Sequence, residues 1–127
     1  GWIKCNFDSG YVHGRDFTIT GWIFRDCTGK TILSGCAHLP KSNSSLEAEA
    51  FGFLFVLQLT WIKGYRNVWF EGDNLELTTL INRWEDHLNI GSLLYDIRYW
   101  MMKLPLCSLD HVNREKNSAA DALSRHA

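Results

Sequence analysis

The order of strand-like and helix-like hydrophobic patterns is the feature that most restricts how this 127-residue chain can fold. Three strand-like segments come first and are joined by short connections. A long segment with apolar residues at helical spacing follows, and then a strand, two helices, a strand and a closing helix. The expected elements are Ile3–Asp8, Phe17–Arg25, Thr31–His38, Leu46–Trp61, Asn67–Glu71, Leu77–Trp84, Leu93–Leu104, Leu106–Val112 and Asn117–Arg125.

This β-β-β-α-β-α-α-β-α order predicts an α/β fold. The first three strands form an antiparallel meander, because their connections are short. The helix between the third and fourth strands requires a parallel crossover. We therefore expect a mixed sheet covered by helices on both faces, built as one domain over residues 1–127, since the chain is too short for two.

The start of the long helix separates two neighbouring glutamates. Ser44-Ser45-Leu46-Glu47 has the form of a capping box, which gives Glu47 a structural role. Two residues along a helix correspond to about 200° of rotation, so Glu47 and Glu49 cannot point at the same place. Glu49 shares a face with Phe53 and Val56, and we assign it to a site at the sheet.

Four carboxylates occupy places where strands end and helices begin. Asp8 ends the first strand, Glu49 lies early in the long helix, Asp73 follows the fourth strand and Asp121 lies in the first turn of the last helix. In α/β sheets, sites gather where such ends converge. Converging carboxylates need a compensating cation, and hard oxygen ligands favour Mg²⁺ or Mn²⁺. We expect two ions.

Each of these carboxylates also has a structural interpretation. Asp73, alone or with Asn74, could cap the second helix, and Asp121 could cap the last helix together with Ser118. Asp8 could be an ordinary turn residue. Glu49 is the hardest to explain in this way, because its face is otherwise apolar and a buried unpaired carboxylate is costly.

Five pieces of the sequence resemble the motifs of the ribonuclease H-like domains found in plant genomes, a family related to the ribonuclease H of reverse transcriptases and retrotransposons. The pieces are Lys4-Cys5-Asn6-Phe7-Asp8, Arg25-Asp26 with Gly29, Ala48-Glu49-Ala50, Glu71-Gly72-Asp73-Asn74, and His111-Val112-Asn113-Arg114-Glu115 with Asn117, Ala120-Asp121 and Leu123. The match runs nearly from end to end. It implies a ribonuclease H-like fold with a five-stranded sheet in the order 3-2-1-4-5.

The resemblance also implies an activity and a set of residues. The family cleaves the RNA strand of RNA/DNA hybrids and leaves a 5′-phosphate and a 3′-hydroxyl, and such enzymes recognise 2′-hydroxyl groups in the minor groove. The catalytic and metal-binding residues would be Asp8, Glu49, Asp73 and Asp121. Polar residues in or beside the motifs are expected to bind a hybrid or double-stranded nucleic acid: Asn6, Ser9, Asn74, Arg114 and Asn117.

Two departures from cellular ribonucleases H, which carry a histidine in the loop before the last helix and a basic protrusion that helps grip the hybrid, leave other functions open. The segment 113–118 has no histidine, and the segment between Asn82 and Leu106 has only three cations, Arg83, Arg98 and Lys103. The whole chain has a formal net charge of −1, although many nucleic-acid binders are basic. The alternatives are a catalytically weak or dormant nucleic-acid-binding module and a protein-interaction surface of a transposon-derived protein.

The remaining expectations concern location and the core. The four cysteines have no CxxC spacing, so zinc is not expected and a reduced intracellular compartment fits better than a disulfide scaffold. We find no apolar run near 18 residues and expect no membrane insertion. A chain that starts at Gly1 with a strand pattern reads as a monomeric domain of a larger protein. Trp61, Trp84 and Trp100 sit at helical spacing and are expected in the core.

Overall fold

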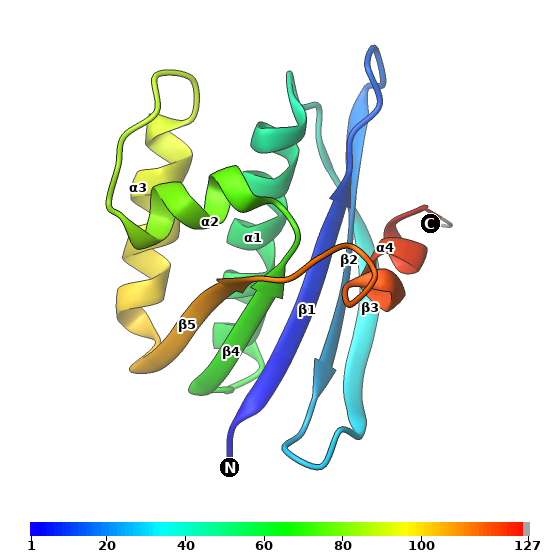
Figure 1. Cartoon of the computed structure of the whole chain (residues 1–127), viewed down its shortest axis with the longest axis vertical. Helices are drawn as coiled ribbons and strands as arrows, with labels where there is room; N and C mark the ends of the chain where they lie inside the picture. The colour runs from blue at the N-terminus through cyan, green and yellow to red at the C-terminus, as the bar shows by residue number, and fades with distance from the viewer. Residues whose placement is uncertain (126–127) are drawn as a thin grey trace.

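The five strands form a single mixed sheet in the order β3-β2-β1-β4-β5 (Figure 1). The computed structural model describes residues 1–125, and the side chains of Asp121, Ser124 and Arg125 lie outside that description. The elements are β1 (Ile3–Gly10), β2 (Phe17–Arg25), β3 (Thr31–Pro40), α1 (Ser45–Ile62), β4 (Asn67–Gly72), α2 (Leu75–Asn82), α3 (Gly91–Lys103), β5 (Leu106–His111) and α4 (Ser118–Arg125). Both the predicted order of elements and the 3-2-1-4-5 sheet are confirmed.

The pairing of β1 with β4 decides which residues share the end of the sheet. These two strands are parallel, with partners running from Ile3 opposite Val68 to Asn6 opposite Glu71. Two residues beyond the last pair, Asp8 and Asp73 come level with each other. The connections explain why β4 runs parallel to β1. The antiparallel meander makes β3 parallel to β1, and the crossover through α1 then makes β4 parallel to β3.

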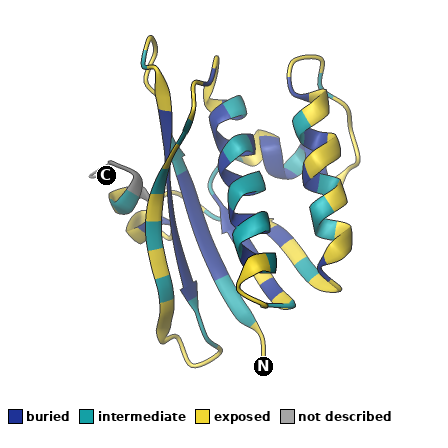
Figure 2. Cartoon of the chain, turned by 180° about the vertical axis from the view of Figure 1, so that it is seen from behind, coloured by how far each residue is buried: buried dark blue, intermediate teal, exposed yellow. Residues whose placement is uncertain are grey.

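Helices cover both faces of the sheet, as the element order predicts. In Figure 1, α1 and α3 lie on one side of the sheet and α4 on the other, where α4 contacts β1 and β2. Figure 2 shows that α1 is largely buried or half-buried, whereas α3 exposes much of its outer side. Helix α1 is therefore the central element of the larger layer.

Aromatic packing fixes α1 against the two central strands. The ring of Phe53 stacks on Phe7 of β1, with centroids 5.0 Å apart, and meets Phe70 of β4 edge-on at 5.3 Å. All three side chains are almost completely buried. Full burial of each such ring contributes about 1.5–3 kcal/mol to folding. Phe53 lies one helical turn after Glu49, so the same packing sets the position of Glu49.

The ends of α1 carry the predicted signals. The hydroxyl of Ser44 accepts a hydrogen bond from the backbone N–H of Glu47 at 3.1 Å, and Glu47 in return accepts one from the backbone N–H of Asn43 at 2.9 Å. The return bond thus reaches one residue further back than in a standard capping box. After the helix, Gly64 has φ +81°, the left-handed conformation that glycine adopts without strain.

Helix α1 is also, within the described part of the chain, the one helix long and apolar enough to cross a membrane. Half of this stretch is buried inside the fold. The central helix of a folded core meets the same criteria of length and composition, so this is weak evidence for a membrane span.

The prediction for Trp84 is wrong, and Asp8 lies deeper than expected. Helix α2 ends at Asn82, and Trp84 follows it with φ +53° and 68% of its surface exposed. Helical spacing does not apply to a residue beyond the end of the helix. Trp61 and Trp100 do pack against the core. Strand β1 continues to Gly10, so Asp8 lies within the strand and is buried.

Candidate active site

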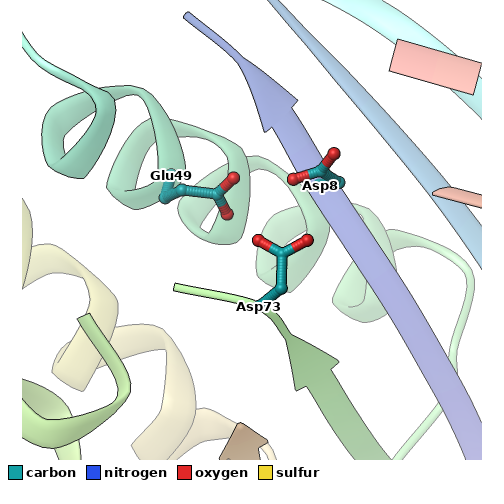
Figure 3. A group of neighbouring side chains, drawn as sticks. All are labelled: Asp8, Glu49 and Asp73. Carbon is teal, nitrogen blue, oxygen red and sulfur yellow. The ribbon is translucent and has the colours of Figure 1, made fainter. Parts of the chain in front are cut away.

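Three of the four predicted carboxylates meet at one end of the sheet. Asp8 comes from β1, Glu49 from α1 and Asp73 from the end of β4, and each offers an oxygen within 4.8 Å of the others. Figure 3 shows the three side chains pointing toward one another. Asp121 lies on α4, but its side chain is outside the described residues, and its part in the cluster stays a prediction.

A close approach between α1 and the sheet places Glu49. One carboxylate oxygen of Glu49 accepts a hydrogen bond from the backbone N–H of Ser9 at 2.9 Å. The helix can come this near because Gly52, three residues later, has no side chain: a Cβ there would lie 2.1 Å from the Ser9 hydroxyl. The choice of Glu49 over Glu47 is supported, since Glu47 is engaged at the helix cap.

The electrostatics of Glu49 are strongly unfavourable for a charged carboxylate. Burial raises its pKa well above the ordinary value of 4.5, and the neighbouring Asp8 raises it further by charge repulsion and by a hydrogen bond between the two carboxyl groups. Such a bond requires one of the two groups to be protonated. When both are ionised, the buried Oε2 of Glu49 has no hydrogen-bond donor among the described residues.

Asp73 is free of the structural role that the sequence left open. The N-cap of α2 is Asn74, whose side-chain oxygen accepts a hydrogen bond from the backbone N–H of Leu77 at 2.9 Å. The capping interpretation of Asp73 is therefore wrong. One oxygen of Asp73 instead accepts a hydrogen bond from the side-chain amide of Asn117 at 3.4 Å.

The carboxylates open into a pocket of about 390 Å³ that includes several predicted substrate-binding residues. Ser9, Asn74 and Arg114 line it. The prediction missed Tyr11 and Arg15, which belong to the β1–β2 connection and line the same pocket. Their signal in the sequence was their position just after the strand that carries Asp8.

The other two predicted substrate contacts are buried beneath the pocket. Asn6 and Asn117 are 4% and 1% exposed, and their amide groups bond to each other at 3.0 Å. In this structure neither side chain lines the pocket. Their contact with substrate therefore stays a prediction, and a motif position alone does not reveal which way a side chain points.

The donor set fits a hard divalent cation. All the converging atoms are carboxylate oxygens, the ligands that Mg²⁺ and Mn²⁺ prefer. A cation would relieve the repulsion that raises the pKa of Glu49 and would give its buried Oε2 a partner.

Solved structures of other proteins share this fold over nearly their whole length. The ribonuclease H1 of the halophilic archaeon Halobacterium salinarum superposes with a TM-score of 0.90 at 19% identity, covering 100% of this chain and 97% of that one. LC11 ribonuclease H1, isolated from compost and solved in complex with an RNA/DNA hybrid, has a TM-score of 0.86 at 19% identity, with coverages of 98% and 95%. The N-terminal ribonuclease H domain of Rv2228c from Mycobacterium tuberculosis has a TM-score of 0.82 at 14% identity, with coverages of 98% and 91%.

Identities this low demonstrate a common fold and nothing finer. No curated protein sequence matches the chain significantly. The profile of the family described as reverse transcriptase-like, however, matches residues 6–127. This match includes all four predicted carboxylates and all but the first five residues. The chain therefore belongs to the reverse transcriptase-like family and has the ribonuclease H-like fold.

Proposed function

We propose that the chain is a metal-dependent endonuclease that hydrolyses the RNA strand of RNA/DNA hybrids. The observation that carries the proposal is the meeting of Asp8, Glu49 and Asp73, together with the buried Oε2 of Glu49 that lacks a donor among the described residues. The likeness to solved ribonucleases H supports a nuclease, and one of them, LC11 ribonuclease H1, is described in complex with such a hybrid.

The residues of the site would act by binding and orienting. Asp8, Glu49 and Asp73 would hold Mg²⁺ or Mn²⁺, with Asp121 as the predicted fourth ligand and two ions as the predicted number. When bound, the ions supply an activated water and stabilise the leaving oxygen of the phosphodiester. The backbone N–H of Ser9 engages Oε1 of Glu49, so Oε2, which accepts no hydrogen bond from the described residues, would be the atom available to bind an ion.

Substrate binding would use the polar groups at the pocket. Arg15 and Arg114 both line it and come from different loops, so their guanidinium groups are suited to phosphates on either side of the cleaved bond. Ser9 and Asn74 line the same pocket and stay predicted contacts to the sugar, where the 2′-hydroxyl distinguishes RNA from DNA. In this structure the Ser9 hydroxyl bonds to Thr20 and the Asn74 oxygen caps α2, so such contacts would use their remaining polar groups.

Cleavage of a labelled RNA/DNA hybrid in millimolar Mg²⁺ tests the proposal. Wild type is expected to cut the RNA strand, and Asp73→Asn to cut more than about a hundredfold more slowly, since even residues that only support a metal ligand are worth ten- to a hundredfold. Asp96→Asn, which changes an exposed aspartate on α3, is the matched control and should cut normally. Equal cleavage by wild type and Asp73→Asn would point to a contaminating nuclease and refute the assignment.

A nucleic-acid-binding module without useful catalysis is the second candidate. It is favoured by the absence of a histidine among the described residues that line the pocket. Salt-dependent hybrid binding with no product after long incubation in Mn²⁺ would support it over the nuclease. A protein-interaction role would instead give no salt-dependent binding to nucleic acid.

Four further expectations stay predictions. They are an intracellular location, a monomeric state, kinship with the plant domains and an origin in a transposon-derived protein. The four cysteines, all free thiols in the structure, agree with a reducing compartment.

A further inference from the structure

A buried chain of polar side chains leads from the centre of the sheet to Asp73. The amide nitrogen of Asn6 donates to Glu71 at 3.1 Å and to the side-chain oxygen of Asn117 at 3.0 Å. The amide nitrogen of Asn117 donates in turn to the backbone oxygen of Phe7 at 2.7 Å and to Asp73 at 3.4 Å. At the far end, Lys4 lies 3.5 Å from the same oxygen of Glu71.

These bonds allow only one orientation of the Asn117 amide. Its oxygen faces a donor, the amide of Asn6, and its nitrogen faces two acceptors. Turning the amide over would set nitrogen against nitrogen and oxygen against two oxygens. Asn6 is fixed in the same way, because its nitrogen donates both to a side-chain oxygen of Glu71 and to the amide oxygen of Asn117.

Asn117 therefore joins the two strands that carry the site. The residue it bonds on β1, Phe7, immediately precedes Asp8, and its second acceptor is Asp73 itself. It reaches them from the loop before α4, where its side chain is 1% exposed. A polar side chain buried so fully is strongly destabilising unless every hydrogen bond is made, so this geometry is tightly constrained.

We propose that Asn117 is a positioning residue that aims the Asp73 carboxylate and sets its spacing from Asp8 for metal binding, and that Asn6 acts through Asn117. The inference rests on the proposed function, since it concerns the same metal site. Partners that orient metal ligands typically change metal affinity by about 10- to 100-fold when they are removed. Asn117 is such a partner, because it bonds to the Asp73 carboxylate and to the backbone next to Asp8.

Calorimetric titration with Mn²⁺ tests the inference without relying on activity. Asn117→Ala is expected to raise the Kd for Mn²⁺ by about 10- to 100-fold. Asn6→Ala should raise it less and in the same direction, and the double variant should bind no more weakly than Asn117→Ala, because the two residues act in series. Circular dichroism on each variant verifies the fold.

The matched control is Asn82→Ala. Asn82, an exposed residue at the end of α2, also donates a side-chain hydrogen bond to a backbone oxygen, that of Leu109 at 2.9 Å, and bonds to none of the site carboxylates that the structure describes. It should lower the melting temperature and leave the Kd for Mn²⁺ unchanged. If lower stability alone weakened metal binding, Asn82→Ala would raise the Kd for Mn²⁺ as Asn117→Ala does. A positioning role predicts a higher Kd only for Asn117→Ala and Asn6→Ala.

Three results would overturn the inference. Folded Asn117→Ala with wild-type affinity for Mn²⁺ removes the positioning role, and additive effects of the two substitutions remove the series arrangement. If Asn117→Ala does not fold, Asn6→Ala with wild-type affinity for Mn²⁺ overturns the inference instead. Wild-type protein that binds no Mn²⁺ is a different result, because it refutes the metal site and the proposed function themselves.

Discussion

Replacing Gly52 by alanine should damage both the stability of the protein and its site. An ideal Cβ at this position lies 2.1 Å from the Ser9 hydroxyl and 2.8 Å from the Thr20 hydroxyl. Ordinary contact begins at 3.4 Å, so the new methyl group is too close by about 1.3 Å and about 0.6 Å respectively. Thr20 is fully buried and β-branched, which leaves it little freedom to move.

The magnitude follows from three contributions. Rotating Ser9 away breaks its 2.8 Å hydrogen bond to Thr20, which costs about 1 kcal/mol. Overpacking against Thr20 costs about 1–3 kcal/mol, while alanine gains about 0.5–1 kcal/mol over glycine inside a helix. The expected net loss in the free energy of unfolding is about 1–3 kcal/mol. Any outward shift of α1 also lengthens the 2.9 Å bond from Ser9 to Glu49 and weakens metal binding.

Urea denaturation of Gly52→Ala and Gly91→Ala measures this directly. Gly91 begins α3, and a Cβ there meets nothing within 4 Å, so alanine should be neutral or stabilise by up to about 1 kcal/mol. The two substitutions are chemically identical, yet only Gly52→Ala should lower the free energy of unfolding, and both should leave the m-value unchanged. Gly52→Ala with wild-type stability and wild-type Mn²⁺ affinity would refute the claim that this glycine permits the close approach of α1.

Three further predictions concern charge and backbone conformation. In metal-free protein, the contribution of Glu49 to the free energy of unfolding is fully present below its ordinary pKa of 4.5 and is lost as the pH rises through the raised pKa, because the folded state holds this proton more tightly. Urea denaturation in chelator should show this loss in wild type, and an equal loss in Glu49→Gln would contradict it. Arg15→Ala and Arg114→Ala should each make the dependence of hybrid affinity on salt less steep, reducing the magnitude of the slope of log affinity against log salt by about one. Fluorescence anisotropy at several salt concentrations measures this slope, and unchanged slopes would exclude phosphate contacts. Gly64→Ala should cost about 1–2 kcal/mol in unfolding free energy and Gly64→Asn less, because φ is +81° there, and equal losses would argue against backbone strain.

The elements of the fold were predictable because each carries its own local signal. Ser44 and Glu47 mark the start of α1, Gly64 marks its end, and the helix between β3 and β4 dictates a parallel pair. The choice between Glu47 and Glu49 needed only the geometry of one helix. Helix ends, strand direction and the facing of a side chain on one helix depend on residues close in sequence, so they can be predicted from the sequence.

The features that were missed depend on distant parts of the chain or on where an element stops. Asn6 and Asn117 are 111 residues apart, and no local pattern shows that their amides meet beneath the site. Trp84 continues the helical spacing of α2, but the helix ends two residues earlier and the backbone turns to a positive φ. The sequence offered both Asp73 and Asn74 as caps of α2, because both are good capping residues, and only the structure selects Asn74.

The pairing of β1 with β4 has a consequence for the kinetics of folding. The bond from Asn6 to Glu71 closes a loop of 65 residues, whereas the β1–β2–β3 meander forms between adjacent segments. Closing long loops is entropically slow, so the meander can assemble before Asp73 reaches Asp8. A half-folded chain therefore has no complete cluster for ions to bind, and divalent ions should slow unfolding while leaving the rate of refolding almost unchanged.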